Sequence, residues 1–222
     1  MGKLIVFEGT DGSGKSTQFE LLAKRLEAEQ IGFQRLRFPQ YEEPSSALIR
    51  MYLGGAFGDD PEAVNAYAAS TFYAVDRYAS YQRVWKDYYQ GGGFVVSDRY
   101  TTSNAVHQGS KVPEGERAEF FRWLYDLEYD RMGLPRPDLV VLLDMPVELS
   151  EQLMRKREQS TGTHADIHER DEDYLKKCRD VALHAAKYYG WRTVSCAKDG
   201  AIRGVEDIHE EVYAIVKSCL ED

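Results

Sequence analysis

Cysteine is scarce in this chain of 222 residues, which has only three, Cys178, Cys196 and Cys219. No two of them form a C-x-x-C pair, so the sequence indicates neither a disulfide framework nor a zinc knuckle. We therefore expect a protein of a reducing compartment.

Long apolar stretches and an excess of positive charge are also lacking. No apolar run approaches the ~20 residues that a membrane-spanning helix needs, and the chain does not begin with a charged-then-apolar signal region. The formal net charge of −9 argues against a nucleic-acid polymer as the partner, although a local basic cleft could bind an anionic metabolite. We expect a cytoplasmic protein with no membrane partner and no nucleic-acid polymer partner.

Apolar runs of strand type alternate with helical patterns along the whole chain. The predicted strands cover residues 4–7, 33–38, 94–98, 139–144 and 193–196. The predicted helices cover residues 18–29, 47–53, 62–90, 114–131, 147–157, 173–189 and 205–220. This order predicts an α/β fold with a five-stranded, mostly parallel sheet and helices on both faces. The unbroken apolar run at 139–144 predicts a strand that is buried on both sides. The length fits a single domain over residues 1–222.

A phosphate-binding pattern, G-x-x-x-x-G-K-[ST], runs from Gly9 to Ser16 between the first predicted strand and the first predicted helix. Its glycines let the backbone turn so that successive N–H groups point at a polyphosphate, and the next helix adds the positive end of its dipole. In such a loop Lys15 reaches the β- and γ-phosphates and the Ser16 hydroxyl holds Mg²⁺. The predicted polyphosphate site is Gly9, Thr10, Asp11, Gly12, Ser13, Gly14, Lys15, Ser16 and Thr17.

Phosphoryl transfer needs further positive charge around the migrating group. Arg99 follows Asp98 at the end of the third predicted strand, where open parallel sheets bind their ligands. Arg77 lies in the long helix predicted at 62–90, and by itself such an arginine is more often a solvated surface residue. The polar segment 159–171 is flanked by basic residues and is expected to be a mobile loop. It could close over phosphates as a lid at about residues 155–172.

Several motifs, in order along nearly the whole chain, resemble those of the thymidylate kinases, a family of phosphate-loop nucleoside monophosphate kinases. They occupy residues 7–17, 37–39, 76–78, 98–100, 103–104, 108–109 and 134–140. The resemblance implies a five-stranded parallel sheet, ATP and Mg²⁺ as the phosphate donor, and transfer to dTMP to give dTDP. It also implies a homodimer.

The resemblance further implies roles for individual residues. Lys15 and Ser16 would serve ATP and Mg²⁺, with Asp98 as a second metal ligand, while Asp11 would organise the acceptor nucleotide and a catalytic arginine. Because neither Gly12 nor Ser13 is basic, that arginine is expected from the lid, as Arg157 or Arg170. The residues expected around the acceptor are Phe38, Phe72, Tyr73, Arg77, Asp98, Arg99, Asn104 and Gln108. Of these, Phe72 or Tyr73 would stack on the base, and Asn104 and Gln108 would read its edge.

The sequence also departs from the family pattern. Many members have an arginine soon after Phe-Pro that grips the acceptor phosphate, but here Pro39 is followed by residues 40–42, Gln-Tyr-Glu. His107 replaces a usual aromatic residue, and Asp171 replaces a frequent tyrosine. Two alternatives therefore stay open, a kinase that acts on the unphosphorylated deoxynucleoside and a non-catalytic, nucleotide-dependent regulator.

Overall fold

The computed structural model describes residues 2–58, 60–161 and 172–221, with the side chains of 61, 156–161 and 172 left out. The chain divides into two compact units. The first unit joins Met1–Val6 to Phe33–Asp138, and the second joins Phe7–Gly32 to Leu139–Asp222. Within the described ranges, no helix is both long enough and apolar enough to cross a membrane.

A five-stranded sheet in the order β2-β3-β1-β4-β5 confirms the predicted α/β class. Its strands are β1 (Lys3–Glu8), β2 (Gln34–Arg37), β3 (Phe94–Asp98), β4 (Leu139–Asp144) and β5 (Arg192–Ser195). β2 pairs with β3 in parallel, with Gln34 opposite Val95, and β4 pairs with β5 in parallel, with Val141 opposite Arg192. All of β3 and the four central residues of β4 are buried. This burial confirms that β4 is covered on both faces.

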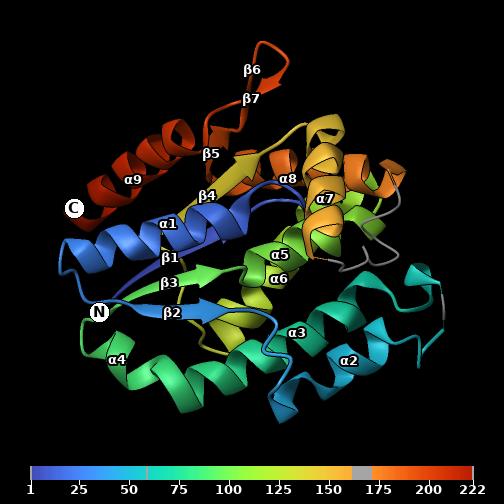
Figure 1. Ribbon diagram of the computed structural model, residues 1–222. Helices are drawn as coiled ribbons and strands as arrows, with labels where there is room; N and C mark the ends of the chain where they lie inside the picture. Colours follow the sequence, from blue (N-terminus) through green and yellow to red (C-terminus); the bar gives the residue numbers. More distant parts are fainter. Residues whose placement is uncertain (1, 59, 162–171, 222) are drawn as a thin grey trace. The chain divides into compact units, whose positions relative to one another are not determined.

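The helices of the first unit lie between and after β2 and β3 in the chain (Figure 1). They are α2 (Ala47–Leu53), α3 (Ala66–Ser80), α4 (Lys86–Gln90), α5 (Thr101–His107) and α6 (Arg117–Tyr125). Short 3₁₀ turns cover Pro44–Ser46, Pro61–Ala63, Gly109–Lys111 and Glu114–Glu116, and π-helical turns cover Tyr81–Trp85 and Asp126–Arg131. The sequence patterns missed α5, because it lacks the preceding proline and the following pair of glycines that marked α2, which is equally short.

The prediction of one continuous helix over residues 62–90 is wrong, because the helix begins only at Ala66. Asp60 accepts a hydrogen bond from the Glu62 amide and caps only a 3₁₀ turn, and the chain is extended again at Val64. The true cap is Asn65, whose side-chain oxygen accepts from the Ala68 amide at 2.9 Å and starts α3. Asn competes well for such a free amide, so a new helix begins where the pattern alone suggested continuity.

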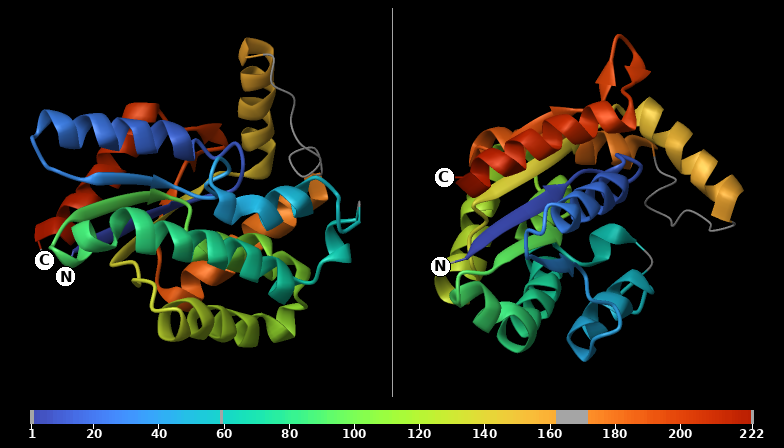
Figure 2. Two further views of the ribbon diagram at one scale, coloured as in Figure 1. Left: turned by 90° about the horizontal axis from the view of Figure 1, so that it is seen from below. Right: turned by 60° about the vertical axis from the view of Figure 1, so that its left-hand side comes forward.

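The second unit contains α1 (Lys15–Ala28), α7 (Val147–Thr161), α8 (Glu172–Tyr189) and α9 (Val205–Glu221). α1 and α9 lie side by side (Figure 1), linked by Arg25 Nη1 to Glu210 at 2.6 Å and by Gln18 Nε2 to the Val205 carbonyl at 2.9 Å. A hairpin of β6 (Ala197–Lys198) and β7 (Ala201–Ile202), which was not predicted, projects after β5 (Figure 2).

The loop predicted to begin at residue 159 cannot begin there, because α7 continues to Thr161. Residues 162–171, and with them most of the predicted lid and Arg170, lie outside the described residues. The single-domain organisation with a lid at about 155–172 stays a prediction.

Replacing the α3 cap, Asn65→Ala, should lower the free energy of unfolding by about 1 kcal/mol, because the Ala68 amide loses its side-chain acceptor. Urea denaturation followed by circular dichroism measures this change. Asn65→Asp is the matched control, because a carboxylate caps as well as an amide and should leave stability near that of the wild type. Equal stability of the alanine variant and the wild type would contradict the assignment of Asn65 as the cap.

Candidate active site

The loop between β1 and α1 has the backbone geometry of a phosphate cradle. Gly12 and Gly14 have φ angles of 75° and 83°, which favour glycine, and Gly9 has a φ of 159°. The Ser13 amide donates to the Thr10 carbonyl at 3.2 Å and closes the turn. α1 then begins at Lys15, three residues before the predicted start, so the loop leads directly into a helix N-terminus. Consecutive amides at such a position form an anion site.

Two of the loop glycines are also required by space. A Cβ atom at Gly9 would lie 2.4 Å from Ser13 Oγ, and one at Gly12 would lie 2.6 Å from the Ser150 carbonyl oxygen. The second contact is with the backbone of α7, which cannot move aside as a flexible side chain can. Both the φ angle and the packing therefore exclude larger residues at Gly12.

An open pocket of about 320 Å³ lies over this loop, and residues 10–17 line it together with Leu153 and Met154 of α7. Its size is that of a small-molecule site. Lys15 is mostly buried and Ser16 is exposed at the start of α1. Ser13 Oγ is buried and has no hydrogen-bond partner within the described part of the chain. The predicted loop residues are thus gathered around one cavity that offers amides, hydroxyls and an ammonium group.

In the first unit, Asp98 and Arg99 lie at the carboxyl end of β3 as the sequence predicts. Asp98 is buried; its Oδ2 accepts from Arg37 Nε at 3.1 Å, while its Oδ1 has no partner among the described residues. Arg99 has a φ of 68°, a strained conformation for a residue with a side chain, and its carbonyl accepts from Ser97 Oγ at 2.6 Å. Strain of this kind is most common at functional sites.

Arg99 is oriented by the unusual His107. Arg99 Nη1 lies 2.8 Å from His107 Nε2. A guanidinium can only donate, so Nε2 must be the acceptor and the imidazole must be neutral with its proton on Nδ1. The residue that replaces the family's aromatic side chain therefore holds the strand-end arginine in place.

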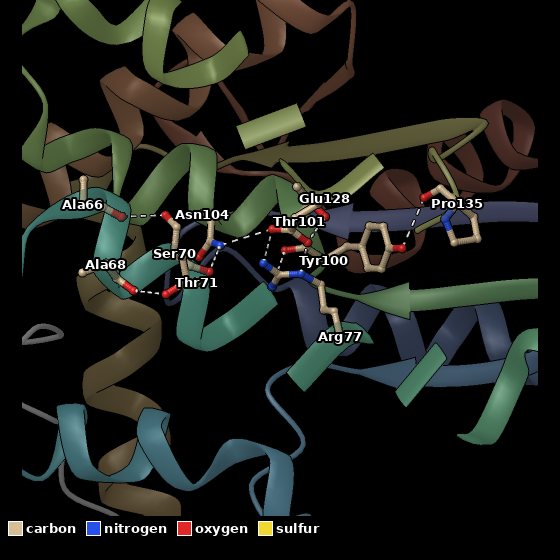
Figure 3. Close-up of polar contacts among 10 residues, drawn as sticks. All are labelled: Ala66, Ala68, Ser70, Thr71, Arg77, Tyr100, Thr101, Asn104, Glu128 and Pro135. Carbon is tan, nitrogen blue, oxygen red and sulfur yellow. Dashed lines mark hydrogen bonds and ion pairs between the residues drawn. The ribbon is translucent and has the colours of Figure 1, made fainter. Parts of the chain in front are cut away.

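Arg77 is not a solvated surface residue, and the interpretation based on its neighbours in the sequence is wrong. Its side chain is 2% exposed, and Nε and Nη2 each donate to Glu128 at 2.6 Å (Figure 3). Its Nη1 donates to the Tyr100 carbonyl at 3.3 Å. Desolvation works to lower the pKa of Arg77, but the Glu128 carboxylate outweighs it and raises that pKa, so the arginine stays charged.

Glu128 gathers further polar residues that sequence reasoning missed or treated separately. Thr101 Oγ1 donates to it at 2.7 Å, and Asn104 Nδ2 lies 3.5 Å from it (Figure 3). Glu128 and Thr101 had no role in the sequence analysis. Neither forms a local motif, because their partners come from three separate helical segments.

The aromatic residues predicted near the acceptor are packed within the first unit. Phe72 makes ring contacts with Tyr52 and Phe57, and Phe38 is 3% exposed and contacts the Tyr100 ring. Burial raises the pKa of Tyr73, so its hydroxyl stays protonated at neutral pH.

Gln108, predicted to read the edge of the acceptor base, is also buried in the first unit. Its Oε1 has no partner among the residues that the structure describes. The amide oxygen is therefore available for an N–H donor of a ligand.

The segment after Pro39 is held by Asp76 and by Arg50, an arginine that lies eleven residues after Pro39. The Gln40 amide donates to Asp76 Oδ2 at 2.8 Å, and Ser45 Oγ donates to Asp76 Oδ1 at 2.7 Å. Arg50 Nη1 donates to the Tyr41 and Glu43 carbonyls of this segment and to the Ser46 hydroxyl. Asp76 therefore fixes the path of this segment through backbone and side-chain contacts.

The lid arginines are not placed. The side chain of Arg157 and all of Arg170 lie outside the described residues. Arg155, two residues before Arg157 in α7, pairs with Glu151 at 3.5 Å and is otherwise largely exposed. The choice between Arg157 and Arg170 stays a prediction.

Comparisons of this chain with known proteins all point to the same family. A family model described as thymidylate kinase matches residues 7–212. The thymidylate kinase of Mycobacterium tuberculosis is 33% identical over 199 residues, which cover 88% of this chain and 92% of that protein. A probable thymidylate kinase of Thermococcus gammatolerans is 32% identical and covers 98% and 97% of the two chains.

A solved structure of thymidylate kinase from Candida albicans has the same fold, with a TM-score of 0.71, 22% identity and coverage of 98% of this chain and 92% of that chain. The sequence matches carry the assignment further than the fold does, because their identities of 33% and 32% exceed the 22% of the structural match. This chain belongs to the thymidylate kinase family of ATP-dependent enzymes, which phosphorylate dTMP to dTDP.

Proposed function

We propose that this chain binds ATP in the pocket over residues 10–17 and transfers its γ-phosphoryl group to the phosphate of dTMP. The observation that carries the proposal is the cradle itself, whose glycine geometry and packing at Gly12 leave an open pocket at the start of α1. Amides and the helix dipole bind the phosphates, and Lys15 stabilises the charge that develops on the transferred group.

Mg²⁺ prefers oxygen ligands, and each residue proposed to hold it offers one: the exposed Ser16 hydroxyl in the second unit and the uncommitted Asp98 Oδ1 in the first. When bound, the ion neutralises charge on the β- and γ-phosphates and aligns them for in-line attack. Ser16 and Asp98 are therefore the proposed metal ligands.

For the acceptor, we propose that Arg99 binds the dTMP phosphate and that the base lies against the residues around Arg77. The proposed base contacts are Phe38, Phe72, Tyr73, Arg77, Asn104 and Gln108. An oxygen of the acceptor phosphate attacks the γ-phosphorus, and the bond to the oxygen that bridges to the β-phosphate breaks, which releases ADP. Asp11 organises the acceptor, and Arg157 or Arg170 supplies a further positive charge. No covalent enzyme intermediate is needed.

The proposed enzyme is a cytoplasmic homodimer. Supporting the dimer, α2 exposes three large apolar side chains, Leu48, Met51 and Leu53, at 40–45% of their surface. Light scattering after gel filtration should give about twice the 25.4 kDa mass of one chain. The double variant Leu48→Ser with Met51→Ser should shift the protein toward the monomer, whereas exclusive monomer in the wild type would contradict the dimer.

The reaction itself is tested by ADP release in a coupled assay with ATP and Mg²⁺, offering dTMP, dUMP, dCMP, thymidine or no acceptor in parallel. Turnover should depend strongly on dTMP. A preference for thymidine would instead support a deoxynucleoside kinase, which the absence of an arginine directly after Pro39 favours. ATP turnover that is independent of any acceptor would support the regulator.

Gly12→Ala should weaken ATP binding at least tenfold, because the new methyl group would lie 2.6 Å from the Ser150 carbonyl and force the cradle out of shape. Gly32→Ala is the matched control, since a Cβ there meets nothing within 4 Å and its backbone is unstrained. Titration of each variant with a fluorescent ATP analogue gives the two affinities. Equal affinity for the Gly12 variant and the control would place the nucleotide elsewhere.

A further inference from the structure

The Glu128 carboxylate collects donors from two helices into one buried cluster. Arg77 of α3 occupies both carboxylate oxygens, Thr101 of α5 donates to Oε2, and Asn104 of α5 approaches Oε1 (Figure 3). Glu128 itself belongs to the π-helical turn after α6 and is fully buried. A single carboxylate thus orients a guanidinium and an amide on separate helices.

The same contacts decide which way the Asn104 amide points. Its Nδ2 lies 3.1 Å from the Ser70 carbonyl oxygen and 3.5 Å from Glu128 Oε1. A carbonyl and a carboxylate only accept hydrogen bonds, so the NH₂ group must face them and Oδ1 must face away. Within the described residues, no protein group donates to this oxygen. Asn104 therefore has an amide oxygen left for a ligand.

Arg77 has the opposite capacity. A guanidinium carries five N–H donors. Glu128 takes one from Nε and one from Nη2, and the Tyr100 carbonyl takes one from Nη1. Two N–H groups are not used in these contacts. Because Arg77 and Asn104 approach the same carboxylate oxygen, a donor and an acceptor are fixed close together.

We propose that Glu128 is a positioning residue that sets the base specificity of this kinase by holding Arg77 as the donor and Asn104 Oδ1 as the acceptor. This pair matches the edge of thymine, which has an acceptor at O4 and a donor at N3. Cytosine presents the reverse, a donor at N4 and an acceptor at N3. The inference rests on the proposed placement of the acceptor base against Arg77 and Asn104.

Holding the amide matters because the two ends of an asparagine side chain have nearly the same shape. If Asn104 turned over, its NH₂ would face the base and match the N3 acceptor of cytosine. Turning would place Oδ1 against the Ser70 carbonyl and the Glu128 carboxylate, so two acceptors would repel it. A site with a fixed polarity rejects the wrong base because buried polar groups would be left unpaired.

The test compares kcat/KM for dTMP with kcat/KM for dCMP in Glu128→Gln. The carboxamide has nearly the same shape, but it brings an NH₂ group into a cluster of donors, so Arg77 or Asn104 must reorient. The ratio of the two kcat/KM values should fall at least tenfold, through slower turnover of dTMP together with unchanged or faster turnover of dCMP. Thr101→Val is the matched control, since it removes one donor to Glu128 and leaves both positioned residues in contact, and its ratio should stay within twofold of the wild type.

Glu128→Asp keeps the charge that Arg77 needs and carries the comparison if Glu128→Gln does not fold. Its shorter side chain withdraws the carboxylate from Asn104, so the ratio should fall severalfold. Folded Glu128 variants in which both activities drop in parallel, with the ratio within twofold of the wild type, would overturn the inference and leave Glu128 as a purely structural residue. Wild-type protein that forms no dTDP would refute the proposed function instead.

Discussion

The charges of Arg77 and Glu128 are both removed from water, and each is stable there only because the other is present. The carboxylate receives two hydrogen bonds of 2.6 Å from the guanidinium and a third from Thr101. Removing one member of a buried pair typically destabilises a protein by about 3–5 kcal/mol, because the remaining charge has no compensation. The arrangement of α3, α5 and the π-helical turn in the first unit therefore depends on this contact. The positions of the proposed acceptor-binding residues on α3 and α5 depend on the same ion pair between Arg77 and Glu128.

The second unit depends on a different constraint, which is steric. The phosphate loop needs positive φ angles at Gly12 and Gly14, and α7 passes so close to Gly12 that no side chain fits there. The loop then leads directly into α1, whose contacts with α9 anchor it at Arg25 and Gln18. In such a loop the backbone amides make most of the contacts with phosphate, and Lys15 is the main side chain that contributes. These amides are preorganised before the nucleotide binds.

The departures from the family pattern also have a physical explanation. Asp76 binds the segment after Pro39 through the Gln40 amide and the Ser45 hydroxyl, and Arg50 donates to the Tyr41 and Glu43 carbonyls, so the segment is held without an arginine directly after Pro39. His107 accepts from Arg99 and orients it, a role for which an imidazole nitrogen is suited and an aromatic hydrocarbon is not. His107 therefore acts directly on the proposed phosphate contact at Arg99.

The sequence by itself determined the five strands, the parallel α/β class and the phosphate loop, because each of these follows from a pattern in neighbouring residues. β3 and β4 have the predicted bounds, and the loop has the predicted strand before it and helix after it. Only the tertiary structure decided that Arg77 is buried, since its partner Glu128 is 51 residues away and belongs to a different helical segment. The break before α3 was decided by the Asn65 cap, which outweighs an unbroken helical pattern. Periodicity in a sequence reports the local backbone, whereas the burial of a charge depends on a partner that only the folded chain brings near.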